Sequence, residues 1–508
     1  MSRVTRNILY NGIGQGLSLA LGFIAVRFVF RSLGGDALGL IYFSQTFSAA
    51  LAVALQLGIC ETAVREVASH AGRSPEYLAR FIRTSSLFYW GAFLLLSLLA
   101  YALAPYLIRH WVKLDSLDVH TATVILRVLS ISALLALPRG LFTALVSGLE
   151  RMEIRNGIDV AGKALQQFGI FGILFFHGSV FQVAYWIAAC CVAQLLAYLI
   201  VCTRFFPVQA MLPGFSLNAV KQNMRFASGL MTITVCAWVF TQADRVIISK
   251  LLPLSVLGLY SFARGTVGQG ALLTGAINNA IFPHFSRLYA AGNTDEMKAS
   301  YHKIHDLICF STIPVFAAAP FAAIPLLSRV FDPPSAHMLL LPVTFLCLGY
   351  YMNGTLTTPY VVSLAVGRPD ITARQNFHSL FVLLPVSVVA IYFLGLNGAG
   401  FSFVLYHVFY YLYGTPRICR ECLGMRARVW HWHVLRILAG GILVYGSAWL
   451  AVSYAGALSI LHLSIAYGGA TIIYLSFAPF FMGQETRRRF LLSFDALRLK
   501  YRDAMASE

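Results

Sequence analysis

Long apolar stretches separated by short polar breaks run along the whole chain. A transmembrane helix needs about 20 mostly apolar residues to cross roughly 30 Å of hydrocarbon. Fourteen stretches meet this requirement, at residues 8–30, 38–60, 84–108, 119–148, 161–177, 181–203, 226–249, 256–282, 307–330, 338–365, 371–394, 398–415, 434–454 and 458–482. The pattern predicts an all-α, polytopic membrane protein of about 14 transmembrane helices.

The composition agrees with this prediction, because 58% of the residues are apolar and only 11% are charged. Ordinary soluble domains carry about 25% charged residues, so a water-soluble enzyme is excluded. The aromatic share of 14% also excludes a disordered chain, in which such side chains are scarce.

The basic residues predict the orientation. The net charge of +18 results from 38 Lys and Arg and 20 Asp and Glu. Of the 38 basic residues, 28 lie in the termini and even-numbered loops, and only 5 lie in odd-numbered loops. Because Lys and Arg are enriched in cytoplasmic loops, both termini are expected in the cytoplasm. The first span lacks a small-residue cleavage pattern, so we expect it to be retained.

Two related motifs occur in the two halves of the chain. The segment Val26–Gln45 reads VRFVFRSLGGDALGLIYFSQ, and Ala243–Arg264 reads ADRVIISKLLPLSVLGLYSFAR. An offset of 219 residues places Leu38-Gly39-Leu40 on Leu257-Gly258-Leu259. Each copy has six spans, which predicts parallel repeats of the kind found in transporters.

The repeat predicts the domain organisation. We expect an N-terminal lobe over 1–210, a C-terminal lobe over 211–425, and a final helix pair with a basic cytoplasmic tail over 426–508. This arrangement and its junction motifs resemble the polysaccharide-flippase branch of the MOP (multidrug/oligosaccharidyl-lipid/polysaccharide) exporter superfamily over about residues 5–482.

The most specific part of the resemblance is Ala243-Asp244-Arg245 followed by Leu257-Gly258-Leu259-Tyr260, with Leu33-Gly34-Gly35 and Gly39 in the first half. The branch includes Wzx-type flippases for O-antigen and exopolysaccharide units, and lipid II flippases and MATE drug exporters are more distant relatives. The resemblance implies a V-shaped pair of lobes and a lipid-linked oligosaccharide as substrate.

Charged residues inside the spans suggest a binding site. Five arginines lie there, together with one clear acid, Asp244; the arginines are Arg27, Arg127, Arg139, Arg245 and Arg264. An arginine at the centre of a membrane helix costs about 2.5–3.5 kcal/mol on insertion scales, so we expect the five to line a shared aqueous cavity. Asp244 is expected to form an ion pair there or to couple transport to a proton or sodium ion.

Each arginine also has a structural interpretation. Arg27 and Arg245 lie about one turn inside the outer boundary, where a long side chain can reach the interface. Arg127 and Arg264 lie deeper, at ~12 Å along the helix, where a structural pair is the alternative. Arg139 follows a proline, and its guanidinium could satisfy a carbonyl that the proline leaves without a donor.

Polar residues at helical spacing support a cavity, namely Asn11 and Gln15 in the first span, Gln45 in the second and Asn278 in the eighth. Such spacing places polar or small side chains on one face of each helix. The alternative is that small residues on these faces allow close helix packing.

The excess of cations suits an anionic substrate, because guanidinium groups bind phosphate oxygens bidentately. We expect the cavity to take the pyrophosphate and sugar head of a polyprenyl-diphosphate-linked oligosaccharide, while its tail stays in the lipid. The alternatives are a lipid II flippase and a cation-coupled MATE-type multidrug exporter, although the first lobe lacks the embedded carboxylates expected of an exporter.

The remaining expectations concern location and partners. We predict a transporter of the bacterial inner membrane rather than an enzyme, with membrane lipids, a polysaccharide polymerase and a chain-length regulator as partners and no nucleic acid or cofactor. Cys419 and Cys422 form a CxxC pair upstream of His431 and His433, but the spacing matches no standard zinc finger, and we predict no metal site.

Overall fold

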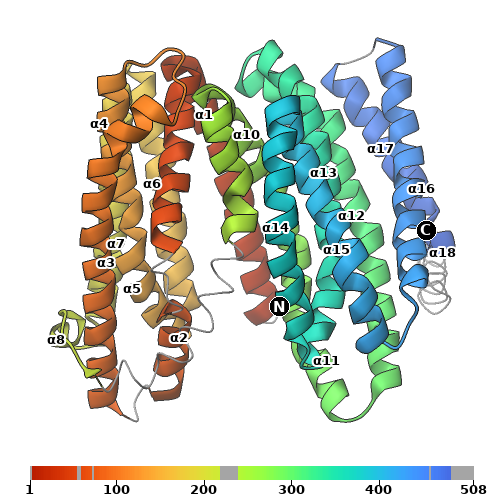
Figure 1. The fold of residues 1–508 in the computed structure, drawn as a ribbon, viewed down its shortest axis with the longest axis horizontal. Helices are drawn as coiled ribbons and strands as arrows, with labels where there is room; N and C mark the ends of the chain where they lie inside the picture. Colours follow the sequence, from red (N-terminus) through yellow and green to blue (C-terminus); the bar gives the residue numbers. More distant parts are fainter. Residues whose placement is uncertain (1–2, 54–58, 71–73, 218–237, 457–458, 482–508) are drawn as a thin grey trace, which may run out of the picture. The chain divides into compact units, whose positions relative to one another are not determined.

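The computed structural model describes residues 3–53, 59–70, 74–217, 238–456 and 459–481, and most of these residues are helical (Figure 1). They belong to two compact units, unit 1 over Met1–Ser261 and unit 2 over Phe262–Glu508. The lobes predicted over 1–210 and 211–425 follow the sequence repeat and not the boundary between these two units, so they stay a prediction. Part of the span predicted over 226–249 lies outside the described residues. The basic tail lies wholly outside them.

Unit 1 is a bundle of helices that begin at local sequence signals. Ser179 and Gln182 form a capping box at the start of one helix, and the Asp118 carboxylate accepts the backbone N–H of Thr121 at the start of another. A helical segment also covers residues 238–251. The helices of unit 1 are α1 (Arg3–Val53), α2 (Ile59–His70), α3 (Pro75–His110), α4 (Val119–Leu134), α5 (Ala136–Gly148), α6 (Met152–Phe175), α7 (Val180–Cys202), α8 (Val208–Met211) and the first half of α10 (Leu254–Gly268).

The long helix α1 consists of two helices joined at Gly34. This residue has a φ of +85° and a ψ of 174°, a conformation that favours glycine. The spans predicted over 8–30 and 38–60 therefore follow each other through one tight kink. The helix that follows the kink carries Leu38-Gly39-Leu40, the first copy of the repeated motif, near its start.

Unit 2 is a second helical bundle, in which α13 packs on α11, α12 and α15. The last long helices, α16 and α17, pack on each other and both contact α12. The helices that follow α10 are α11 (Ala271–Ala290), α12 (Thr294–Val330), α13 (Pro333–Ala365), α14 (Pro369–Leu394), α15 (Leu396–Glu421), α16 (Ala427–Tyr454), α17 (Ile460–Ser476) and α18 (Ala478–Phe481).

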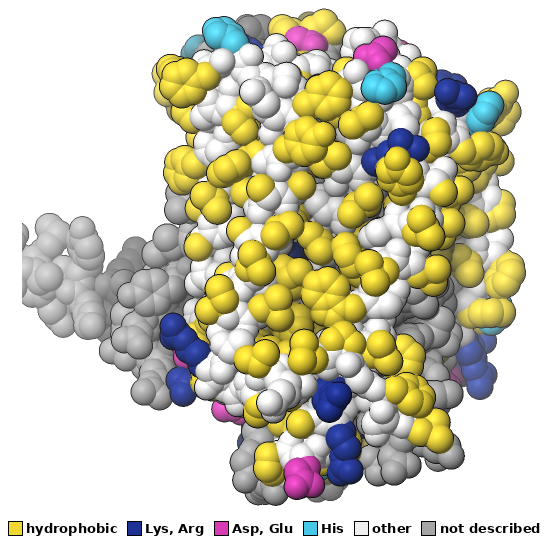
Figure 2. All heavy atoms as spheres, turned by 90° about the vertical axis from the view of Figure 1, so that its left-hand side faces the viewer, with side chains coloured by type: hydrophobic (Ala, Val, Ile, Leu, Met, Phe, Trp, Pro, Cys, Tyr) yellow, Lys and Arg dark blue, Asp and Glu magenta, His cyan; other side chains and the backbone are white. Residues whose placement is uncertain are grey.

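The surface of the helices fits a lipid environment. Among the described residues, eight helices are long and apolar enough to cross a membrane. On α3, Leu94, Leu95 and Leu98 are each more than 60% exposed. Figure 2 shows hydrophobic side chains across the middle of one face, with most charged side chains toward its upper and lower ends. An all-α, multi-pass membrane fold is thus confirmed.

Candidate functional site

The two pieces of the motif over 243–260 meet in unit 1. The phenol O–H of Tyr260, on α10, donates to Oδ2 of Asp244 at 2.6 Å, and both side chains are buried. Arg245 donates from Nη1 to Oε1 of Gln242 at 3.0 Å. Its Nε is buried and has no hydrogen-bond partner among the described residues. Asp244 and Arg245 therefore have different neighbours, and Arg245 retains a donor for a ligand.

The repeated Leu-Gly-Leu motifs also touch each other. A Cβ on Gly258 would lie 2.8 Å from the backbone N of Gly39, and a Cβ on Gly39 would lie 2.6 Å from the carbonyl carbon of Leu254. Neither position has room for a side chain. The sequence offset of 219 residues thus aligns two glycines that are in contact within unit 1.

The α3–α4 loop, residues 111–118, binds the first copy of the junction. Oδ2 of Asp36 accepts hydrogen bonds from the backbone N–H groups of Asp115, Ser116 and Leu117 at 2.8, 2.6 and 3.2 Å. Asp36 is only 1% exposed. A buried carboxylate is costly without donors, so Asp36 depends on this loop.

The α3–α4 loop also binds the second copy of the junction, at the turn before α10. Oγ of Ser255 donates to Oδ2 of Asp115 at 2.8 Å, and the backbone N–H of Leu254 donates to the carbonyl of Lys113 at 2.9 Å. Lys113 and Lys250 donate in opposite directions to backbone carbonyls across this contact. All of these residues belong to unit 1. Sequence reasoning missed the network, because hydrogen bonds to a loop backbone leave no periodic signal.

Arg127, on α4, binds to a kink in α3. Its Nε donates to the carbonyl oxygen of Tyr101 at 3.1 Å, and its guanidinium carbon lies 3.9 Å from the centre of the Tyr101 ring. Pro105, four residues after Tyr101, has no N–H and leaves that carbonyl without its helical donor. Arg127 therefore supplies the hydrogen bond that Pro105 removes.

Arg139, on α5, contacts the amide of Gln194 on α7 through Nη1 and Oε1. The side chain of Gln194 in turn covers Gly162 of α6, where a Cβ would lie 2.6 Å from its Cγ. Gly162 therefore lets three helices meet around one arginine and one amide. The Arg139 side chain is half-buried at this junction.

Arg264 lies in unit 2 and is 5% exposed. Its guanidinium carbon stands 4.6 Å from the centre of the Phe403 ring, on α15. One turn further along, His407 is buried and binds the Phe403 carbonyl through Nδ1 at 2.7 Å. A buried arginine over an aromatic face is an arrangement in which a cation–π contact offsets part of the desolvation cost.

The remaining predicted residues are distributed over both units. Arg27 and Gln45 are exposed on α1, and Oδ1 of Asn278, on α11, is buried without a hydrogen-bond partner among the described residues. Asn11 and Gln15 belong to α1, but their side chains lie outside the described residues. A cavity shared by all five arginines stays a prediction.

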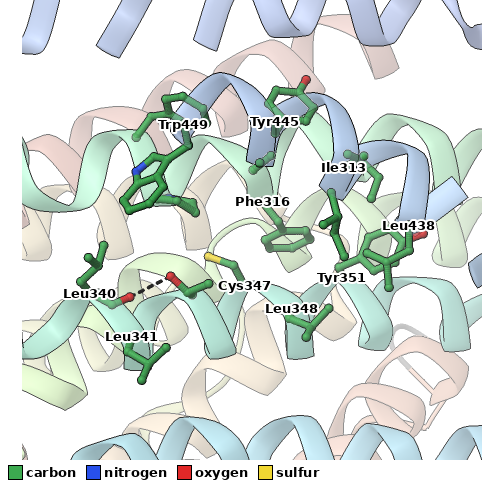
Figure 3. Close-up of a pocket in the computed structure, with 17 residues that line it drawn as sticks. Ile313, Phe316, Leu340, Leu341, Cys347, Leu348, Tyr351, Leu438, Tyr445 and Trp449 are labelled. Carbon is green, nitrogen blue, oxygen red and sulfur yellow. Dashed lines mark hydrogen bonds between the residues drawn. The ribbon is translucent and has the colours of Figure 1, made fainter. Parts of the chain in front are cut away.

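An apolar cavity of about 410 Å³ lies within unit 2 between α12, α13 and α16. Figure 3 shows Phe316, Cys347, Tyr351 and Trp449 around it. Its walls are almost entirely hydrocarbon and aromatic rings, so it suits an acyl or prenyl chain and not a charged group.

The CxxC pair and the two histidines have separate environments. Nε2 of His433 lies 2.8 Å from Oδ1 of Asp306, and His431 binds backbone carbonyls through both ring nitrogens. Burial raises the pKa of the Cys422 thiol to about 11. No group of three or more His, Cys, Asp or Glu side chains placed to hold a metal occurs among the described residues.

Comparisons with known proteins agree with the fold. The family described as "Polysaccharide biosynthesis protein" matches residues 4–289. The lipopolysaccharide biosynthesis protein WzxC of Escherichia coli (strain K12) is 21% identical over 199 residues, which cover 39% of this chain and 40% of WzxC. The chain thus matches less than half the length of that relative.

Two solved structures resemble the whole bundle. The lipid II flippase MurJ in an inward closed conformation gives a TM-score of 0.72 at 13% identity, covering 92% of this chain and 98% of MurJ. An inward-facing multidrug resistance MATE family transporter of the MOP superfamily gives 0.65 at 13% identity, covering 79% of this chain and 94% of the transporter. At this level of identity the similarity concerns the fold alone.

Proposed function

Because the chain belongs to the polysaccharide biosynthesis protein family, we propose that it is a flippase for polyprenyl-diphosphate-linked oligosaccharides. It moves repeat units from the cytoplasmic to the outer leaflet of the bacterial inner membrane by alternating access. The units then enter O-antigen, capsule or exopolysaccharide synthesis. Both termini are in the cytoplasm.

The excess of arginines over acids in the spans carries this proposal. Arg245 has a buried donor without a partner among the described residues, and Arg264 is buried against Phe403. Guanidinium groups in such places bind the oxygens of a diphosphate, whose desolvation otherwise prevents its passage through hydrocarbon. An organic cation would be repelled by the same side chains.

The polyprenyl tail remains in the membrane while the head group crosses. The apolar cavity between α12, α13 and α16 supports this separation, since its walls are almost entirely hydrocarbon and aromatic rings. Asp244 is the proposed site of proton or sodium coupling, and the Tyr260 hydroxyl donates a hydrogen bond to it. A polymerase and a chain-length regulator act on the product.

Deletion of the gene in the source bacterium tests the function. The expected result is loss of a surface glycan and accumulation of its lipid-linked repeat unit on the cytoplasmic leaflet, reversed by the wild-type gene. If the lipid-linked units still reach the outer leaflet, the proposal is wrong.

A lipid II flippase is the second candidate, because the MurJ fold covers 92% of this chain. The same deletion separates the two functions. Accumulation of lipid II with cell lysis supports the second candidate, whereas growth with an altered surface glycan supports the first.

A further inference from the structure

The helix α6 carries a charged residue that the sequence pattern places in a loop. The pattern predicts a span over 161–177, with Lys163 at its cytoplasmic edge, but α6 begins at Met152. At 1.5 Å per residue, Lys163 lies about 16 Å along the helix from that start. The Lys163 side chain is exposed, and it makes no hydrogen bond or ion pair with another described residue.

The lipid-facing side of α6 is apolar and lies opposite Lys163. Leu165, Phe168 and Phe175 are 48%, 61% and 62% exposed. A helix turns by about 100° per residue, so these three residues share one side of α6, away from the face that bears Lys163. Lipid therefore covers the apolar side and not the lysine.

Lys163 lies on the inward face of α6, between its contacts with two other helices. On one flank, Gly169 packs against Trp186 of α7. On the other flank, the Phe171 ring meets the Phe28 ring of α1 edge-on at 4.9 Å. Further along the same face as Lys163, Ile170 is 4% exposed and buried in the bundle. The lysine thus lies on the face of α6 that packs toward α1 and α7, and its side chain is exposed there.

Two polar groups accompany the lysine. Gln167, one turn further along the same face, has a buried Oε1 without a hydrogen-bond partner among the described residues. On the neighbouring face, Gly162 is covered by Gln194, which binds Arg139. An ammonium and an unsatisfied amide oxygen therefore lie one turn apart on α6, and the Asp159 carboxylate one turn before Lys163 accepts the Tyr198 hydroxyl at 2.8 Å.

We propose that Lys163 and Gln167 form a binding site for the phosphorylated sugar at the head of the lipid-linked substrate. The ammonium binds phosphate oxygens, and the amide oxygen of Gln167 accepts a sugar hydroxyl. This site rests on the proposed function and adds to it a part of the head-group pathway inside unit 1. A lysine that faces hydrocarbon is energetically costly, and contact with water and phosphate removes that cost.

Binding of undecaprenyl diphosphate to the full-length protein in nanodiscs tests the site. We expect Lys163→Ala to raise Kd about tenfold or more, because a hydrogen bond between charged groups is lost. Lys163→Arg should stay close to wild type, and the matched control Lys303→Ala, which removes an exposed lysine at the cytoplasmic end of α12, should not change Kd. The same Kd for Lys163→Ala and wild type would overturn the site.

The variants Lys163→Cys and Phe168→Cys keep the test independent of folding. A membrane-impermeant thiol reagent should label Lys163→Cys, and undecaprenyl diphosphate should protect it, whereas Phe168→Cys should not be labelled. Lack of labelling at position 163, or labelling without protection, contradicts the site. If wild type itself does not bind the probe, the proposed function fails and not only this assignment.

Discussion

Gly39 and Gly258 lie in direct contact, although 219 residues separate them in the sequence. We expect Gly39→Ala to lower the stability of the protein by about 1–3 kcal/mol, because the added methyl group collides with the backbone at Leu254. Thermal unfolding in detergent measures the change. Gly91→Ala on α3 is the control, since its methyl group meets nothing within 4 Å. Equal melting temperatures for the two variants would show that the contact is loose.

The buried Asp36 carboxylate is expected to be the main support of the α3–α4 loop. Asp36→Ala removes an acceptor shared by three backbone N–H groups, so we expect a loss of about 1–3 kcal/mol. Hydrogen exchange should show faster exchange at Ser116 and Leu117. Ser255→Ala removes a single exposed hydrogen bond of the same loop and should have a smaller effect. Unchanged exchange in Asp36→Ala would contradict this role.

The role of Arg127 can be measured by a double-mutant cycle with Pro105. If Arg127 donates to the Tyr101 carbonyl that Pro105 leaves free, Arg127→Ala should lower the free energy of unfolding by about 1–3 kcal/mol in the wild type. It should cost less in a Pro105→Ala background, where the helix restores its own donor. Additive effects of the two substitutions on thermal unfolding would exclude this coupling. Loss of glycan export in Arg127→Ala without loss of stability would favour the substrate role instead.

Arg264 is expected to act on the substrate. Arg264→Ala should abolish surface glycan in the deletion strain while the protein still inserts and accumulates. Arg264→Lys should restore little surface glycan, because an ammonium binds a diphosphate through one point and lacks the planar contact with Phe403. Quantitative glycan staining and membrane immunoblotting measure the two quantities. Wild-type glycan in Arg264→Ala would remove the anion-binding interpretation of this residue.

The thiol of Cys422 should react slowly with alkylating reagents at neutral pH. Burial raises its pKa to about 11, and the thiolate is the reactive form. Its rate of labelling should therefore rise about tenfold per pH unit from pH 7 to 10 and level off above pH 11. Arg420→Cys, at an exposed position in the same segment, is expected to react faster at pH 7. Equal rates at pH 7 would show that Cys422 is accessible.

The sequence pattern predicts the fold well, because crossing a membrane requires apolar segments of fixed length. The all-α membrane fold and the family follow from it. The position of Lys163 within α6 does not follow from the pattern, because Asp159 and Lys163 interrupt the apolar stretch and the predicted span begins later than α6. A charged residue that faces an interior is counted as a loop residue when only hydropathy is considered.

The contacts of the site residues are also only partly predictable. The proline argument made for Arg139 applies instead to Arg127, whose partner carbonyl lies on another helix. The bond between Asp244 and Tyr260 joins two pieces of one motif, but sequence spacing cannot show which groups approach each other. The Asp36 network joins three segments that are far apart in the chain.

The α3–α4 loop has a consequence for how this sequence can diverge. Asp36 recognises backbone N–H groups of residues 115–117, and the two lysines of the network bind backbone carbonyls. Leu117 therefore contributes only its backbone to the network and is free to vary, whereas the acid at position 36 and Asp115, which binds Ser255, are not. Related chains should show an acidic residue at this position opposite loops that differ at the position of Leu117, so that the loop can change there without loss of the fold.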